Sequence, residues 1–292
     1  MSSPSLRESR FGSYVASTAI GCGGMGVVYR ARHQTTGLEV ALKTIRAPAV
    51  ELVAAFRREV QVLAQLEHPG IVRIIEHDFS ADVPWYAMEL VEGRSLAALL
   101  QRGWSASDVD GDLGPAYVST LALEPAVARP LSAPVSSNRG PSYFSTARAE
   151  LIRLARRICE ALAFLHERGL VHRDLKPENV LVRPSGEPVL VDFGLVATFS
   201  GHVGRDVLDF ADAGGTFAYM APEQKLGRFV DARADLFSLG CILYECITGE
   251  LPFGPLGARD FDVEAPRSST LSPEVPAELD TLVARLLAGN PR

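Results

Sequence analysis

Hydrophobic periodicity divides the chain into a strand-rich first part and a helix-rich second part. In the first 90 residues, short runs of alternating or β-branched residues predict strands, while residues 50–66 have a helical period ended by His68-Pro69-Gly70. Thr35-Thr36-Gly37 has the chemistry of a hairpin turn. We therefore predict an antiparallel sheet with one helix packed on it, its strands at residues 14–20, 27–33, 39–45, 71–77 and 85–90.

The second part carries predicted helices at residues 148–166, 234–248 and 277–287. In the first of these, apolar residues recur at three- and four-residue steps and give one buried face, and Gly169 ends the helix. Residues 103–145 are rich in proline, glycine and serine, so we predict a flexible insertion there. The predicted fold class is α+β, with a small sheet lobe and a larger, mainly helical lobe.

Composition argues against several classes of protein. The chain of 292 residues is 47% hydrophobic, enough for a large core, and its net charge of −6 argues against nucleic acid as a partner. The sequence holds no run of about 18 apolar residues, so no membrane span is expected. The four cysteines form no CxxC pair, which favours a reduced, cytoplasmic protein with mostly buried thiols.

A glycine-rich segment follows the G-x-G-x-x-G-x-V pattern, in Ile20-Gly21-Cys22-Gly23-Gly24-Met25-Gly26-Val27-Val28. Glycine lets the main chain approach a phosphate closely, so that the backbone amides can bind the anion. A dinucleotide site would need a helix directly after the loop, but a β-branched strand follows here. The pattern therefore predicts a flap between two strands, with a plain glycine-rich hairpin as the alternative.

Lys43 lies in the apolar run Val40-Ala41-Leu42 of a predicted strand. A buried ammonium is costly unless it is paired, and Glu59 on the following helix is the candidate partner. Such an ion pair would hold the ammonium against nucleotide phosphates. A solvated lysine at the end of a strand is the alternative that the residues leave open.

Two polar loops follow in the second part of the chain. The first is His172-Arg173-Asp174-Leu175-Lys176-Pro177-Glu178-Asn179, and the second, Asp192-Phe193-Gly194, comes after an apolar run. Two carboxylates and an amide beside short strands provide the hard oxygen ligands that Mg²⁺ prefers, and phosphate oxygens can complete its shell. The two loops therefore predict a magnesium–phosphate site.

These motifs, in this order, resemble those of the eukaryotic-type (Hanks-type) Ser/Thr protein kinase family, including its bacterial members. The resemblance implies a two-lobed fold and an enzyme that transfers the γ-phosphate of ATP to Ser or Thr hydroxyls of proteins, autophosphorylation included. The resemblance covers the chain outside the insertion. It implies a tail at residues 1–10 and a kinase domain at residues 11–292. Within this domain the implied N-lobe is at 11–90, the hinge at 88–93 and the C-lobe at 94–292.

The resemblance also implies how ATP is bound. Lys43 would pair with the α- and β-phosphates, and Glu59 would be its helix partner. Met88 would guard the back of the nucleotide pocket, and the main chain of Glu89 and Val91 would hydrogen-bond adenine. The other implied nucleotide-binding residues belong to the glycine flap or surround adenine: Ile20, Gly21, Cys22, Gly23, Gly24, Met25, Gly26, Val27, Val28, Ala41 and Leu181.

Asp174 matches the catalytic aspartate of the family, which orients the substrate hydroxyl and takes its proton late in phosphoryl transfer. Lys176 would steady the γ-phosphate. Asp192 matches the main Mg²⁺ ligand and Asn179 the second, with Mn²⁺ as an alternative ion. The pairing of Lys176 with Thr216, a residue of the substrate site, resembles the Ser/Thr branch rather than the tyrosine branch.

Two further features are implied by the resemblance. One is a stacked set of core residues, Leu63, Ile74, His172 and Phe193. The other is a contact in which Asp235, on a buried helix, anchors the loop at His172 and Arg173. Arg173 also matches the arginine that receives a phosphorylated residue, for which Thr198 and Ser200 are the candidate phosphosites; constitutive activity is the alternative.

Departures from the family pattern leave the partners and the activity partly open. The insertion at 103–145 has no fixed family counterpart, and the closing helix is expected to be missing after Arg292, so a regulatory domain or partner is expected at one of these places. A pseudokinase or nucleotide-binding scaffold is the first alternative function, although the residues required for transfer are all present. A small-molecule phosphotransferase of kinase-like fold is the second.

Overall fold

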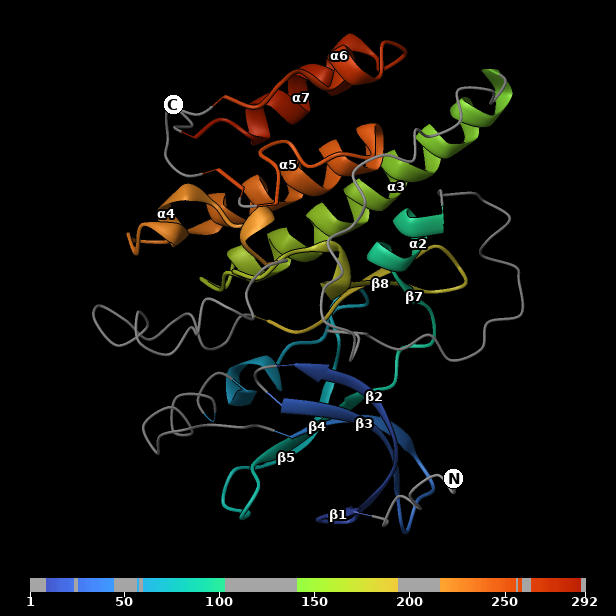
Figure 1. The fold of residues 1–292 in the computed structure, drawn as a ribbon. Coiled ribbons are helices and arrows are strands. Elements are labelled where there is room, and N and C mark those ends of the chain that lie inside the picture. Colours follow the sequence, from blue (N-terminus) through green and yellow to red (C-terminus); the bar gives the residue numbers. More distant parts are fainter. Residues whose placement is uncertain are drawn as a thin grey trace, which may run out of the picture.

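The computed structural model describes residues 9–23, 26–44, 57, 60–102, 141–193, 216–255, 257–258 and 264–289. Its first lobe is a six-stranded antiparallel sheet with the strand order β1-β2-β3-β4-β6-β5. Figure 1 shows this sheet at one end of the molecule, with the long helices at the other. The strands are β1 (Ser9–Phe11), β2 (Tyr14–Gly23), β3 (Gly26–His33), β4 (Glu39–Thr44), β5 (Ile74–Asp78) and β6 (Trp85–Glu89).

The second lobe is built mainly from helices. α5 (Ala232–Thr248) is buried along most of its length and lies between α3 (Pro141–His166) and α7 (Ala277–Leu286) (Figure 1). It begins at its N-cap Asp231, whose side chain accepts the N–H of the second residue of the helix, and it ends at Gly249, which has a left-handed φ of 75°. The shorter helices are α2 (Leu96–Arg102), α4 (Pro222–Lys225) and α6 (Ser268–Leu271).

A three-stranded sheet lies where the two lobes meet. The Leu190 N–H donates to the carbonyl of Gly70, and the Val72 N–H donates to the carbonyl of Leu190. The segment that precedes β5 is therefore hydrogen-bonded to the second lobe. The strands of this sheet are β7 (Arg94–Ser95), β8 (Val180–Val182) and β9 (Pro188–Leu190).

Two hydrophobic clusters lie on opposite faces of the large sheet, because successive side chains of a strand point to opposite sides. In β4, Ala41 belongs to the larger cluster, whereas Val40 and Leu42 belong to the smaller one. The larger cluster also contains Leu181 of β8 and much of α3 and α5. The hydrophobic core therefore continues from the sheet into the helical lobe.

The predicted two-lobed α+β fold is confirmed. The predicted strands agree with β2, β3, β4 and β6 within three residues at each end, and the helices at 234–248 and 277–287 agree equally well. The strand predicted at 71–77 begins only at Ile74, because Ile71 forms an isolated bridge with Leu190 of the other lobe. The short strands β1 and β7 were not predicted.

Two predictions concern segments that the structure describes in part. α3 begins at Pro141 rather than at residue 148, so the end of the predicted insertion at 103–145 is helical. Proline is tolerated in the first turn of a helix, where its missing N–H would have no partner. Residues 103–140 lie outside the described residues, as does most of the helix predicted at 50–66, of which residues 60–63 are helical.

Two other expectations concern surface properties. Among the described residues, none of the helices combines the length and the apolar character needed to cross a lipid bilayer. The expectation of mostly buried thiols is confirmed only in part. Cys241 is buried and Cys22 and Cys246 are half-buried, but Cys159 lies on an exposed face of α3.

Candidate active site

The loop between α3 and β8 carries three of the predicted catalytic side chains. Asn179 is the last residue of a 3₁₀ turn that begins at Pro177, whose ring fixes the backbone. The Asn179 Nδ2 group donates to the carbonyl of Asp174 at 2.7 Å and to its carboxylate Oδ2 at 2.9 Å. Lys176 Nζ lies 3.0 Å from the same Oδ2. These contacts hold Asp174, Lys176 and Asn179 together.

Lys43 of β4 and Asp192, which follows β9, form an ion pair between the lobes, with 2.6 Å between Nζ and Oδ1. Burial alone would lower the pKa of Lys43, but the Asp192 carboxylate outweighs burial and the pKa of Lys43 is raised. The ammonium is therefore charged at neutral pH, as phosphate binding requires. The partner predicted for Lys43, Glu59, lies outside the described residues.

Asn179 connects the ion pair to the loop. Its Nδ2 group also lies 3.4 Å from the main-chain carbonyl of Asp192. Contacts therefore run without interruption from Lys43 through Asp192, Asn179 and Asp174 to Lys176. The fold thus gathers side chains that are up to 149 positions apart in the sequence at the place where the two lobes meet.

Two residues in or next to this cluster have left-handed backbones although they are not glycine: Arg173, which precedes Asp174, at φ 66° and Asp192 at φ 52°. Such a conformation costs about 1–3 kcal/mol, so the surroundings must impose it. At Arg173, the fully buried Asp235 does so, since its carboxylate accepts the N–H of His172 at 2.9 Å and that of Arg173 at 2.8 Å. His166 Nε2 lies 2.8 Å from the same carboxylate.

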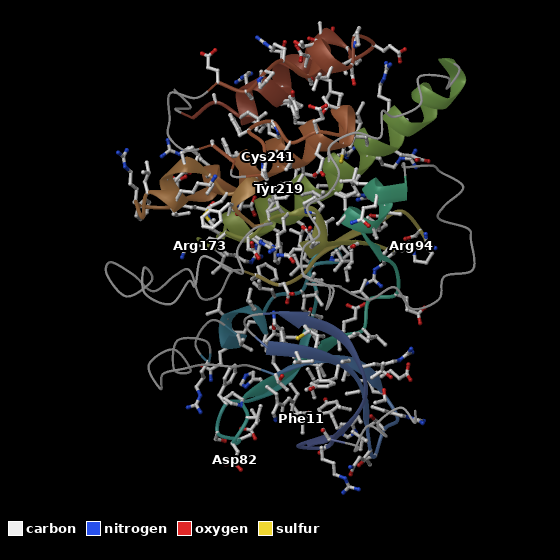
Figure 2. The ribbon with its side chains drawn as sticks, in the orientation of Figure 1. Phe11, Asp82, Arg94, Arg173, Tyr219 and Cys241 are labelled. Atoms are coloured by element: carbon white, nitrogen blue, oxygen red, sulfur yellow. The ribbon has the colours of Figure 1, made fainter. Side chains whose placement is uncertain are left out.

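The predicted anchoring of this loop by Asp235 is therefore confirmed. Figure 2 shows Arg173 at the side of the helical lobe that faces the sheet. The predicted stacking of His172 on Phe193 is also present, with 4.6 Å between the ring centroids. Because Phe193 directly follows Asp192, this contact joins the two polar loops.

The buried ring of His172 should make stability depend on pH. Burial lowers the pKa of His172 below its ordinary value, despite the nearby carboxylates of Asp235, Asp174 and Asp192. As the pH falls below about 6.5, the unfolded chain takes up this proton before the folded chain does, so folding stability decreases by at most about 1.4 kcal/mol per pH unit. Urea unfolding at pH 7 and pH 5 should show a smaller loss for His172→Phe, which keeps the aromatic stacking, than for the wild type. An equal loss would contradict this assignment.

The predicted glycine flap is the hairpin of β2 and β3. Gly23 pairs with Gly26 where the two strands end, and Gly26 has φ 144°, which only glycine adopts readily. Farther along the hairpin, Gly21 pairs with Val28 and Cys22 with Val27. A strand and not a helix follows the glycines, so the structure excludes the dinucleotide alternative.

The apolar residues expected around adenine lie in one buried cluster. Ala41 is paired with Met88 across β4 and β6, and Val28 is paired with Lys43 across β3 and β4, which brings Lys43 beside this cluster. Glu89 is the last residue of β6 and begins the link to the second lobe. The cluster contains Val28, Ala41, Met88, Val91 and Leu181, with Ile20 packed against it.

The donor atoms at Asn179 and Asp192 fit a hard divalent cation. Asn179 is 1% exposed, and within the described part of the chain its buried Oδ1 has no hydrogen-bond partner, which is unusual for a buried amide oxygen. An amide oxygen and a neighbouring carboxylate are ligands of the kind that Mg²⁺ prefers. The residues present are therefore suited to the predicted metal.

Some predicted site residues are not placed by the structure. Gly24, Met25, Thr198 and Ser200 lie outside the described residues. Thr216 begins the 3₁₀ turn Thr216–Ala218, but its side chain is not among those described.

The residues that follow Thr216 are attached to the rest of the lobe by contacts that were not predicted. Gln224 Nε2 donates to the carbonyl of Arg173 at 2.7 Å. The Tyr219 hydroxyl donates to the buried carboxylate of Glu245, and Ser238 Oγ donates to the carbonyl of Tyr219 at 2.8 Å. Figure 2 shows Tyr219 within the helical lobe. These partners are 19 to 51 positions apart, a separation at which no periodic pattern links residues.

Replacing Tyr219 with phenylalanine should destabilise the protein by about 1–3 kcal/mol, because a buried carboxylate loses a donor. Burial and the Glu245 carboxylate raise the pKa of Tyr219, so its hydroxyl remains a donor at any working pH. The matched control is Tyr244→Phe on α5, whose hydroxyl makes no hydrogen bond within the described residues. Equal unfolding free energies of the two variants in urea titrations would refute the role given to the Tyr219–Glu245 bond.

Comparison with known proteins then identifies the family. The profile described as "Protein kinase domain" matches residues 14–292. The chain belongs to the protein kinase family. A mutant form of the PknI kinase domain of Mycobacterium tuberculosis supports the fold alone, with a TM-score of 0.64, 24% identity, and coverage of 100% of this chain and 92% of that one. Protein kinases in general use ATP with a divalent metal ion and act on proteins.

Two curated relatives indicate the branch of the kinase family. The serine/threonine-protein kinase Pkn1 of Myxococcus xanthus is 34% identical over 97% of this chain and 36% of its own length. A probable serine/threonine-protein kinase of Streptomyces coelicolor is 32% identical over 96% of this chain and 37% of its own length. The chain thus resembles bacterial Ser/Thr kinases of the Hanks type and spans little more than a third of the length of these relatives.

Proposed function

We propose that this chain is an ATP-dependent serine/threonine protein kinase that transfers the γ-phosphate of ATP to protein hydroxyls, including its own. The observation that carries the proposal is the continuous set of contacts from Lys43 through Asp192, Asn179 and Asp174 to Lys176. These side chains provide two ammonium groups, two carboxylates and an amide at one place. Phosphoryl transfer needs little more from a protein than positioning and neutralisation of charge.

In the proposed site, Asn179 Oδ1 and the Asp192 carboxylate hold Mg²⁺, for which Mn²⁺ is an alternative. The metal would supply neutralisation of charge on the phosphate oxygens. Lys43 binds the α- and β-phosphates. Since Lys43 Nζ already lies 2.6 Å from Asp192, the lysine and the metal ligand can act on the same triphosphate. The adenine would lie between apolar residues of the two lobes, including Val28, Ala41 and Leu181.

Asp174 is the proposed acceptor of the proton from the substrate hydroxyl. Its Oδ2 is held by Asn179 Nδ2 on one side and by Lys176 Nζ on the other, so its direction is fixed before the substrate arrives. Lys176 also balances negative charge on the γ-phosphate during transfer. We assign the Ser/Thr branch from Lys176 together with Thr216, and the names of the two curated relatives support this assignment.

Several finer points belong to the same proposal. We propose residues 11–292 as the kinase domain, with the hinge at 88–93, and a cytoplasmic location. Asp108, Asp110 and Asp112 give the insertion an acidic segment, for which a solvated tether is the first interpretation and a docking place for a regulatory partner at residues 103–145 is the alternative. Thr198 and Ser200 remain the candidate phosphosites for docking on Arg173.

The proposal is tested by γ-phosphate transfer to a generic basic protein in the presence of Mg²⁺, with the modified residues identified by mass spectrometry. We expect phosphoserine and phosphothreonine in the substrate and in the chain itself, and no transfer when the metal is chelated. Nucleotide binding without any transfer would favour the scaffold alternative. Phosphotyrosine alone would contradict the assignment of the branch.

A further inference from the structure

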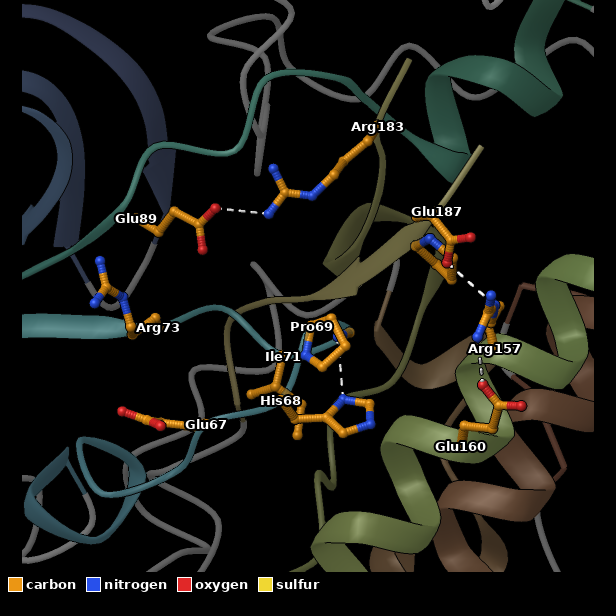
Figure 3. Close-up of a pocket in the computed structure, with 12 residues that line it drawn as sticks. Glu67, His68, Pro69, Ile71, Arg73, Glu89, Arg157, Glu160, Arg183 and Glu187 are labelled. Atoms are coloured by element: carbon orange, nitrogen blue, oxygen red, sulfur yellow. Dashed lines mark hydrogen bonds and ion pairs between the residues drawn. The ribbon is translucent and has the colours of Figure 1, made fainter. Parts of the chain in front are cut away.

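The side chain of Glu89, at the end of β6, forms an ion pair with Arg183, the residue that follows β8, with 2.6 Å between Oε1 and Nη2. The two residues belong to different lobes. Figure 3 shows this pair at one side of a cavity of about 800 Å³, with a second ion-pair group, Arg157 with Glu160 and Glu187, at the other side. Of these two ion-pair groups, the Glu89–Arg183 pair is the one that includes a residue of the proposed hinge, residues 88–93.

The main chain of the hinge is hydrogen-bonded at one end and closely packed at the other. The Glu89 N–H donates to the carbonyl of Arg73 at 2.8 Å, so both the backbone and the side chain of Glu89 are fixed. At the other end of the hinge, Gly93 has φ 155°, and a Cβ there would lie 2.3 Å from the carbonyl oxygen of Val182 and 3.1 Å from the Cα of Arg183. Arg183 therefore contacts the Glu89 end of the hinge through its side chain, and the main chain of Val182 and Arg183 lies close to the other end at Gly93.

We propose that Arg183 is a positioning residue for nucleotide binding, which acts by fixing the hinge through Glu89. This inference rests on the proposed function, in which the main chain of Glu89 and Val91 binds adenine. Arg183 contacts none of the side chains of the catalytic cluster through a hydrogen bond or ion pair in the described part of the chain. Its loss should therefore weaken binding of ATP and leave the transfer step itself nearly unchanged.

The size of the effect follows from the exposure of the pair. The side chains of Arg183 and Glu89 are 31% and 34% exposed, so water and salt screen their attraction in part. A pair of this kind corresponds to a change of about two- to fivefold in an equilibrium constant. The same screening means that the effect of removing Arg183 should shrink as the salt concentration rises.

The test compares Arg183→Gln with the matched control Arg157→Gln, which breaks the neighbouring ion-pair group at α3 without touching the hinge. We expect Arg183→Gln to raise both the Kd of a fluorescent ATP analogue and the KM for ATP about two- to fivefold, with kcat close to that of the wild type. Arg157→Gln should leave all three unchanged. The reversed pair, Glu89→Arg with Arg183→Glu, should recover most of the lost affinity, and Arg183→Lys should retain part of it.

The outcomes separate this inference from the proposed function. A wild type that binds and uses ATP, with an unchanged Kd and KM in Arg183→Gln, would overturn the positioning role and leave the kinase assignment intact. Equal changes in Arg183→Gln and Arg157→Gln would overturn it as well, because they would indicate general loosening of the lobe. If Arg183→Gln does not fold, the Kd and KM of the reversed pair and of Arg183→Lys are compared with those of the wild type and of Arg157→Gln instead. A wild type that binds no nucleotide would overturn both proposals.

Discussion

Replacing Asp174 with asparagine should lower the rate of γ-phosphate transfer by roughly 10²- to 10⁴-fold, the usual contribution of a positioned proton acceptor. The amide keeps an oxygen that can accept from Asn179 Nδ2, but it loses the negative charge that faces Lys176 Nζ at 3.0 Å. It also cannot take the proton of the substrate hydroxyl. Initial rates with labelled ATP and a generic basic protein give the comparison.

Nucleotide binding and stability should change little in this variant, since the role proposed for Asp174 concerns the substrate hydroxyl and not adenine. Asp82→Asn is the matched control, because it makes the same chemical change on an exposed loop at the far end of the sheet lobe (Figure 2). The control should transfer phosphate at the wild-type rate. If Asp174→Asn also transferred phosphate within about threefold of the wild-type rate, the role given to Asp174 would be wrong.

Replacing Asp235 with alanine should cost about 3–5 kcal/mol of folding stability, the loss expected when one partner of a buried charged network is removed. Asp235 is fully buried, and its removal leaves the N–H groups of His172 and Arg173 and the ring of His166 without their acceptor. The left-handed backbone at Arg173 would then lack the contact that imposes it. Phosphate transfer should therefore fall together with stability, as the loop that carries Asp174 relaxes.

Asp231→Ala is the matched control for this second variant. Asp231 is the N-cap of the same helix but is only partly buried, so its loss should cost only about 1 kcal/mol. Urea titrations followed by circular dichroism give both free energies. If Asp235→Ala yields no folded protein, Asp235→Asn, which keeps one acceptor oxygen, should show an intermediate loss. Similar losses for Asp235→Ala and Asp231→Ala would contradict the anchoring role.

Local patterns in the sequence were sufficient to predict the lobes and the loops of the candidate site. The glycine pattern followed by a strand predicts the β2–β3 hairpin, and the long apolar face predicts α3. The polar residues at 172–179 and 192–193 lie next to short strands in the sequence and in the fold alike. The anchoring by Asp235 came from the resemblance to kinases, since no local pattern links residues 62 or 63 positions apart.

What could not be predicted depends on the arrangement of distant segments. The Lys43–Asp192 contact joins a strand of one lobe to a loop of the other, and the residues alone suggested Glu59 as the partner of Lys43. The Glu89–Arg183 pair and the close approach of Gly93 to Val182 exist only because the segment that follows β6 runs beside the end of β8. Ile71 is β-branched, as strand residues often are, and we predicted it in a strand. Instead it forms an isolated bridge with Leu190 of the other lobe.

The central claim is that Lys43, Asp174, Asn179 and Asp192 surround a single metal-bound triphosphate. It is tested most directly by a crystal structure of the chain with a non-hydrolysable ATP analogue and Mn²⁺, whose anomalous scattering locates the metal. We predict the metal at Asn179 Oδ1 and the Asp192 carboxylate, with the α- and β-phosphates at Lys43 and the γ-phosphate between Lys176 and Asp174. A metal or triphosphate bound away from these four side chains would contradict the claim.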